Sequence, residues 1–168
     1  MTNNLIDRLR TPIPLPDRIL EIVAGIMLMA LLVMTEILYD MSPDTVPSHF
    51  SFTGKADGWS DKSFYWQISC LFVLFMLVDF ISAYYTEMNT VRITRKKNMN
   101  ELQKQLYSRM CRVINIGMAF LWCSILLSTS SEFLGIGQHM LIIIFITSIA
   151  FIAVPVIYYR IRIIKSNY

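Results

Sequence analysis

The sequence predicts an all-α membrane protein, a bundle of four transmembrane helices with a structured loop between the first two. Hydrophobic residues make up 55% of the 168 residues and charged residues only 16%, where a soluble domain has roughly a quarter. The apolar residues form four blocks of about twenty residues, which is enough to cross the lipid core. A polar stretch over residues 40–63, rich in proline and glycine, separates the first two blocks and is expected to have a fixed shape.

The first apolar block covers residues 19–39. It is too long for the apolar region of a signal peptide, so we predict an uncleaved first transmembrane helix. The second helix is predicted over residues 64–85. Aromatic residues at both of its ends, including Tyr65 and Trp66 at the start, predict belts at the two membrane interfaces.

A basic connector over residues 87–109 follows the second helix. Residues 99–112 have a helical pattern, so this segment either lies along the membrane surface or extends the third helix into the cytoplasm. The third span is predicted over residues 110–127 and the fourth over residues 139–159. Pro155 lies in the last turns of the fourth span, where a kink is tolerated in lipid.

The basic residues are distributed unevenly between the two ends of this bundle. Thirteen of the 15 lysines and arginines lie before the first span, in or beside the connector, or after the fourth span. The other two, Lys55 and Lys62, lie in the loop over residues 40–63. The positive-inside rule therefore predicts one membrane domain, residues 1–168, with cytoplasmic termini and an extracytoplasmic loop. This distribution favours the lipid bilayer as the partner and argues against nucleic acid.

The extracytoplasmic loop is the expected site of recognition. Residues 43–47 are expected to be extended, residues 48–52 to form a short strand, and residues 54–59 to form two closely spaced turns. Prolines and glycines set the backbone, and the polar and aromatic side chains present the contact surface. The predicted binding residues are Pro47, His49, Phe50, Gly54, Asp57, Gly58, Trp59 and Lys62.

Glu36 lies about one turn inside the outer end of the first span. Its predicted contact is with Lys62 or with a histidine, which ties the loop to the bundle. The alternative is a divalent metal site in a carboxylate–histidine cluster of Glu36, His49 and His139. We assign no metal and no cofactor to the chain.

Asp79 lies within the second span, and a lone carboxylate at that depth costs several kcal/mol. Arg112 and Asn115, in the first turns of the third span, lie at a comparable depth. We therefore predict a contact between Asp79 and Arg112 or Asn115, with a proton- or ion-coupled role for Asp79 as the alternative.

The loop residues form a pattern, V-P-x-H-F followed by G-x-x-D-G-W-x-x-K, between Val46 and Lys62. This pattern closely resembles the signature of a bacterial membrane domain of unknown function that opens the SdpI-type immunity proteins, which protect a cell from a secreted peptide toxin. The domain also occurs alone in short bacterial membrane proteins. The connector resembles those short members at Val91, Ile93, Thr94, Asn98, Gln105, Tyr107, Arg109, Met110 and Arg112. The resemblance covers about residues 36–115.

The resemblance implies a multi-pass protein of the bacterial cytoplasmic (inner) membrane whose loop recognises a secreted peptide or an envelope component. The alternative is a small accessory subunit of a membrane transport complex, such as an ABC-type exporter, so the partner is an unidentified peptide or membrane protein. A third hypothesis is a metal-dependent membrane enzyme that uses His49 and Asp57. Because no set of nucleophile, base and orienting residue is visible, we predict no enzymatic activity.

Overall fold

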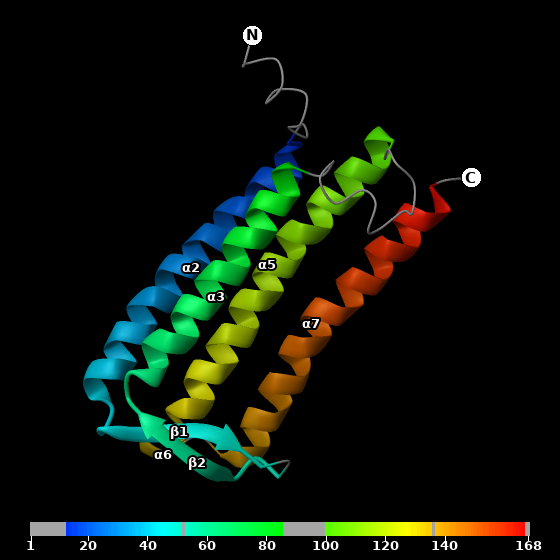
Figure 1. Ribbon diagram of the computed structural model, residues 1–168. Coiled ribbons are helices and arrows are strands. Elements are labelled where there is room, and N and C mark those ends of the chain that lie inside the picture. The colour runs from blue at the N-terminus through cyan, green and yellow to red at the C-terminus, as the bar shows by residue number, and fades with distance from the viewer. Residues whose placement is uncertain (1–12, 52, 86–99, 136, 167–168) are drawn as a thin grey trace.

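The computed structural model describes residues 13–51, 53–85, 100–135 and 137–166. Four of the described helices are long and apolar enough to span a membrane, which confirms the predicted fold class. Figure 1 shows a β-hairpin at the end of the bundle opposite the start of the first helix and the end of the last. The elements in chain order are α2 (Leu15–Met41), β1 (Thr45–Phe50), β2 (Ala56–Asp61), α3 (Phe64–Tyr84), α5 (Glu101–Thr129), α6 (Ser131–Leu134) and α7 (Gln138–Lys165).

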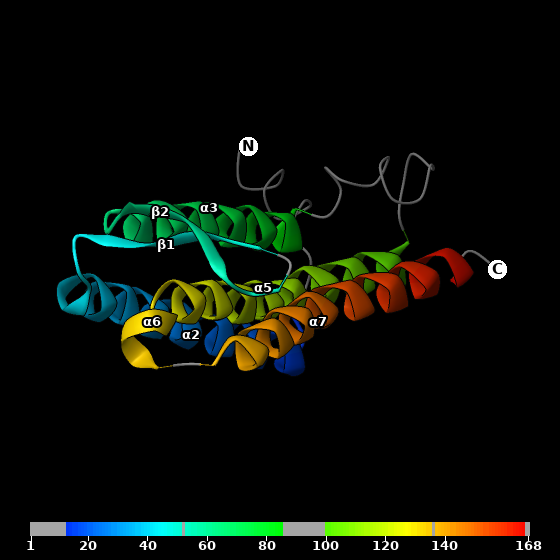
Figure 2. The ribbon, with the colours of Figure 1, turned by 90° about the horizontal axis from the view of Figure 1, so that it is seen from below.

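Helix α5 is the centre of the bundle, because it packs against α2, α3 and α7. In Figure 1, α5 lies between α7 and the pair formed by α2 and α3, and Figure 2 shows the hairpin crossing the end of the bundle. Gly117 lets α7 approach closely, since a Cβ there would lie 2.7 Å from a side-chain carbon of Ile152. The remaining faces of α7 expose apolar side chains, as expected for a helix that contacts lipid.

The main hydrophobic core lies between α2, α3 and α5, in the half of the bundle next to the hairpin. Trp122 is fully buried at its centre, and its ring stacks on Phe72 with centroids 6.0 Å apart. Val46 of β1 belongs to the same cluster, so the hairpin is joined to the core by an apolar side chain. A second cluster at the other end of the bundle includes Leu106 of α5 and Ile163 of α7.

Helix α3 matches its predicted span, residues 64–85, to within one residue, and the other three long helices extend beyond theirs. The third begins at Glu101, which supports extension of the helix rather than a separate surface segment over residues 99–112. Its start is set by a capping box: the Asn100 side chain accepts the Gln103 N–H, and the Gln103 side chain accepts the Asn100 N–H. Residues 87–99, the larger part of the predicted basic connector over residues 87–109, lie outside the described residues.

Two local predictions are wrong. Residues 54–59 do not form two turns, because residues 56–61 are a β-strand and the reversal lies at residues 51–55. The glycine at position 58 lies within the strand. Tyr65 does not belong to an interfacial belt, because it is buried in the core and its hydroxyl group is hydrogen-bonded there.

Candidate functional site

One face of the hairpin packs on the helical bundle, and the other face, called the open face below, is exposed. Strands β1 and β2 pair antiparallel, with Thr45 opposite Asp61 and Pro47 opposite Trp59. Exposure alternates along β2, where Asp57, Trp59 and Asp61 are exposed and the residues between them are partly buried. The open face therefore presents an aromatic ring between two carboxylates.

The side chains of His49 and Asp57 contact each other on this open face. The His49 Nδ1 lies 2.5 Å from the Asp57 Oδ1, although the two side chains are 74% and 47% exposed. Gly58 lies opposite His49, and a Cβ at that position would be 3.0 Å from the His49 Cβ. The absence of a side chain at Gly58 therefore makes room for the histidine. The carboxylate holds the ring through Nδ1 and leaves Nε2 for an external partner.

The reversal between the strands is closed by backbone hydrogen bonds. The N–H of Ser51 donates to the Lys55 carbonyl and the N–H of Gly54 donates to the Ser51 carbonyl, both at 2.8 Å. Gly54 has a φ of 79°, in the left-handed region that side chains other than glycine disfavour. The predicted role of Gly54 as a backbone residue therefore has a specific conformational cause. Phe50 is partly buried beside this reversal.

The base of the hairpin is held by Lys62. Its Nζ lies 3.5 Å from the Asp44 Oδ1 and 5.1 Å from the centre of the Tyr39 ring. The predicted contact with Glu36 is not present among the described residues, where Glu36 is exposed and Lys62 has these nearer partners. Asp61 accepts the Ser63 N–H at 2.8 Å, and this hydrogen bond lowers the pKa of the Asp61 carboxyl.

A buried polar layer lies beneath the hairpin, and sequence reasoning did not find it. The Tyr65 hydroxyl lies 2.8 Å from the Ser130 hydroxyl and 3.1 Å from the Ser42 hydroxyl. Because Ser42 ends α2 and Ser130 ends α5, this tyrosine joins three helices at the level where the chain enters and leaves the hairpin. The layer comprises Thr35, Ser42, Tyr65, Ser69, Trp122 and Ser130.

The next contacts in the polar layer lie deeper in the core. The Ser69 hydroxyl lies 2.8 Å from the Thr35 hydroxyl and accepts the Trp122 Nε1–H at 3.1 Å. All three residues are buried, so each polar group has found a partner in place of water. The layer therefore fixes the relative positions of α2, α3 and α5 under the hairpin.

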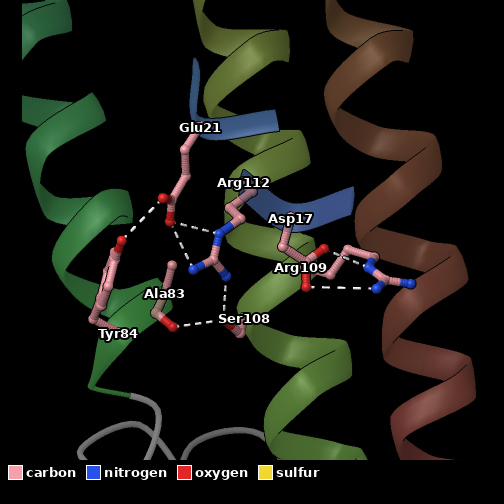
Figure 3. Close-up of polar contacts among 7 residues, drawn as sticks. All are labelled: Asp17, Glu21, Ala83, Tyr84, Ser108, Arg109 and Arg112. Atoms are coloured by element: carbon pink, nitrogen blue, oxygen red, sulfur yellow. Dashed lines mark hydrogen bonds and ion pairs between the residues drawn. The ribbon is translucent and has the colours of Figure 1, made fainter. Parts of the chain in front are cut away.

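Figure 3 shows a second polar region at the opposite end of the bundle. The buried Asp17 of α2 binds Arg109 of α5, with Arg109 Nε 2.6 Å from Asp17 Oδ1. Glu21, one turn further along α2, binds Arg112, whose Nε and Nη2 lie 2.8 and 2.7 Å from Glu21 Oε1. The ion-pair cluster consists of Asp17, Glu21, Tyr84, Ser108, Arg109 and Arg112.

Arg112 connects three helices within this cluster. It donates to the Ser108 hydroxyl, which donates at 2.7 Å to the Ala83 carbonyl at the end of α3. The Tyr84 hydroxyl donates to the second oxygen of Glu21 at 2.9 Å, and the Arg112 guanidinium lies 5.3 Å from the centre of the Tyr84 ring. The predicted pairing of Arg112 with Asp79 is therefore wrong, because the Arg112 guanidinium binds the carboxylate of Glu21 on α2 instead.

The sequence contains a signal for this cluster. Asp17 and Glu21 are four residues apart, and Arg109 and Arg112 are three residues apart, so each pair lies on one face of its helix. Both pairs also fall at the same end of adjacent spans.

Asp79 and Asn115 remain apart from these contacts. In the part of the chain that the structure describes, Asp79 is half-buried and makes no hydrogen bond or ion pair. Asn115 is buried, and its Oδ1 has no hydrogen-bond partner there. The predicted contact between the two is thus not formed either. No group of three metal-binding side chains lies within the described residues, and the side chain of His139 is outside them.

Residues 26–76 match the family model of a domain of unknown function, DUF1648. The match spans the second part of α2, the whole described hairpin and the first part of α3, so it includes His49, Asp57, Trp59 and Lys62. No curated protein and no solved structure matches the chain. The chain is a multi-pass membrane protein in which residues 26–76 are similar to the DUF1648 domain.

Proposed function

We propose that this chain is a binding or sensing protein of the bacterial inner membrane. Its hairpin recognises a secreted peptide or an envelope component on the outer side. The observation that carries this proposal is the pairing of a fixed inner face with an open face that presents His49, Asp57 and Trp59. Such a face suits recognition because its backbone is already ordered before a partner binds.

The rigidity of the hairpin supports recognition rather than a simple connection between helices. Val46 is only 1% exposed in the core, and Tyr65 ties the ends of α2 and α5 below it. Trp59 is nevertheless 55% exposed. Exposed tryptophan on an ordered surface is typical of residues that dominate binding energy when a partner covers them.

The chemistry of the open face favours one class of ligand. Asp57 and Asp61 flank Trp59 along β2, and the Asp61 carboxyl is held in its ionised form by the Ser63 N–H. A peptide with a basic side chain next to an apolar one would satisfy both the carboxylates and the ring. His49 Nε2 would accept or donate one further hydrogen bond according to its protonation.

The proposal requires the hairpin to face outward, as the basic residues predict. A cysteine introduced at Ala56 should react with a membrane-impermeant maleimide in intact cells. A cysteine introduced at Asn98, in the predicted cytoplasmic connector, should react only after the cells are broken. The reverse pattern would contradict the orientation.

Recognition is tested by capture of the partner in cells. A photo-reactive amino acid at Thr45, an exposed position on the same hairpin, is used for cross-linking in every variant. We expect His49→Ala and Trp59→Ala to abolish the cross-linked product while expression and melting temperature stay near those of the parent. Thr53→Ala, at the exposed reversal, is the matched control and should retain the product.

The same experiment separates the rival functions. If both variants lower the melting temperature and capture falls in proportion, the hairpin only seals the end of the bundle. If the captured partner is a transport protein, the chain is an accessory subunit that docks through this face. A captured secreted peptide or envelope component supports the proposal.

A further inference from the structure

The end of α7 carries cations that nothing in the described structure neutralises. Helix α7 contains no aspartate or glutamate between Gln138 and Lys165. Arg160, Arg162 and Lys165 are all exposed, and Arg160 and Lys165 make no hydrogen bond or ion pair within the described part of the chain. At the same end of the bundle, by contrast, Arg109 and Arg112 of α5 each bind a carboxylate.

The last turns of α7, which carry these cations, are anchored to α5. Ile163 is fully buried against α5, and its carbonyl accepts the Gln103 side-chain N–H at 3.2 Å. The carbonyl of Ser166 accepts the Asn100 side-chain N–H at 3.3 Å. The last turn of α7 is therefore held to the start of α5, and the neighbouring cationic side chains project around the outside of that anchor.

One of the cations is already oriented by an aromatic ring. The Arg162 guanidinium lies 5.8 Å from the centre of the Tyr158 ring, and its Nη1 donates to the Tyr158 hydroxyl at 3.2 Å. This contact leaves the other N–H groups of the guanidinium directed to the surroundings. Tyrosine and arginine together at a helix end are typical of the zone of lipid head groups.

The flank of α7 at this end is apolar and exposed, as in a helix that faces lipid. Ile157, Ile161 and Ile164 are exposed there, and α7 packs chiefly against α5. A phospholipid lying along these side chains would place its phosphate beside the cations. Arginine binds phosphate through paired N–H donors, and lysine adds a point charge.

We propose that the end of α7 formed by Tyr158, Arg160, Arg162 and Lys165 binds the head groups of anionic phospholipids. The apolar flank holds the acyl chains, and the tyrosine hydroxyl and the three cations, which project from different sides of the last turns of α7, contact the phosphates of the lipids around it. The site does not depend on the function of the hairpin, nor on which side of the membrane this end faces.

Native mass spectrometry of the purified full chain in detergent tests the site. The protein is titrated with dioleoylphosphatidylglycerol and, separately, with dioleoylphosphatidylcholine. We expect tighter binding of phosphatidylglycerol, and a loss of about fivefold in its affinity for each cation removed. Arg160→Gln with Lys165→Gln should therefore weaken phosphatidylglycerol binding by roughly 25-fold and leave phosphatidylcholine binding unchanged.

The matched control removes the same charge from the other end of the bundle. Lys55→Gln should change phosphatidylglycerol affinity less than twofold, whereas Lys165→Gln alone should lower it about fivefold. Equal binding of the two lipids by the parent protein, or equal losses in Lys55→Gln and Lys165→Gln, would overturn the proposal. A salt titration of the parent protein gives a measurement free of folding effects: phosphatidylglycerol affinity must fall with added NaCl, and an affinity independent of salt refutes the site.

Discussion

Removal of the Arg112 guanidinium is the sharpest test of the ion-pair cluster. Arg112→Met keeps an unbranched side chain of similar length and removes the charge. The parent side chain is 2% exposed and contacts Glu21, Ser108 and Tyr84. After the substitution, the Glu21 carboxylate keeps only the Tyr84 hydroxyl among its described partners.

The magnitude follows from the burial of the two charges. Breaking a buried ion pair by removing one partner costs about 3–5 kcal/mol, because the remaining charge is left uncompensated. The Glu21 side chain is 18% exposed and can recover some hydration, so we expect a loss of about 3 kcal/mol. Removal of both charges, in Glu21→Met with Arg112→Met, should bring the free energy of unfolding back to within about 1 kcal/mol of the parent value.

Reversible unfolding in mixed detergent micelles, followed by circular dichroism, measures these free energies. Arg160→Met is the matched control, because Arg160 is exposed and makes no hydrogen bond or ion pair within the described part of the chain. That substitution should change the free energy of unfolding by no more than about 0.5 kcal/mol. An Arg112→Met variant no more destabilised than the control, or additive losses in the double variant, would refute the expected coupling of Glu21 and Arg112.

Three further changes test separate parts of the structure, each by the free energy of unfolding in the same micelles. Gly54→Ala should cost about 1 kcal/mol because of the left-handed backbone at that residue, whereas Gly25→Ala, inside α2 with open space around it, should not destabilise the protein. Trp122→Phe should cost about 1–3 kcal/mol, since the Ser69 hydroxyl loses the indole N–H in a buried site. Asp79→Leu should not destabilise the protein, because the carboxylate has no described partner to lose; a clear loss would reveal a pairing.

The four helices could be predicted because the cost of exposed backbone in lipid makes long apolar blocks helical. The level of a residue along its helix also follows from the sequence, through the rise per residue. Which residues pair with one another could not be predicted. Asp79 and Arg112 lie at comparable depth, yet the rotation and packing of the helices bring Glu21 to the guanidinium instead.

The hairpin was only partly predictable for a different reason. Glycine is typical of turns, so the sequence predicts a turn at Gly58. Its place within β2 depends on the histidine opposite it on β1. Tyr65 looks like an interfacial aromatic residue by position alone. Its burial follows from Ser42 and Ser130, hydroxyl groups at the ends of two other helices, which no local pattern connects to it.

The matched segment contains only part of the core beneath the hairpin. Residues 26–76 supply parts of two helices and the hairpin, but Trp122, at the centre of that core, belongs to α5, and Ser130 caps the end of α5. The hairpin's position is therefore set by a helix outside the match. It follows that a change in the core face of α5 can move the open face that carries His49 and Trp59 without altering either residue. A loss of partner capture in Trp122→Phe, with the His49–Asp57 pair chemically intact, would therefore indicate that recognition depends on the scaffold as well as on the contact residues.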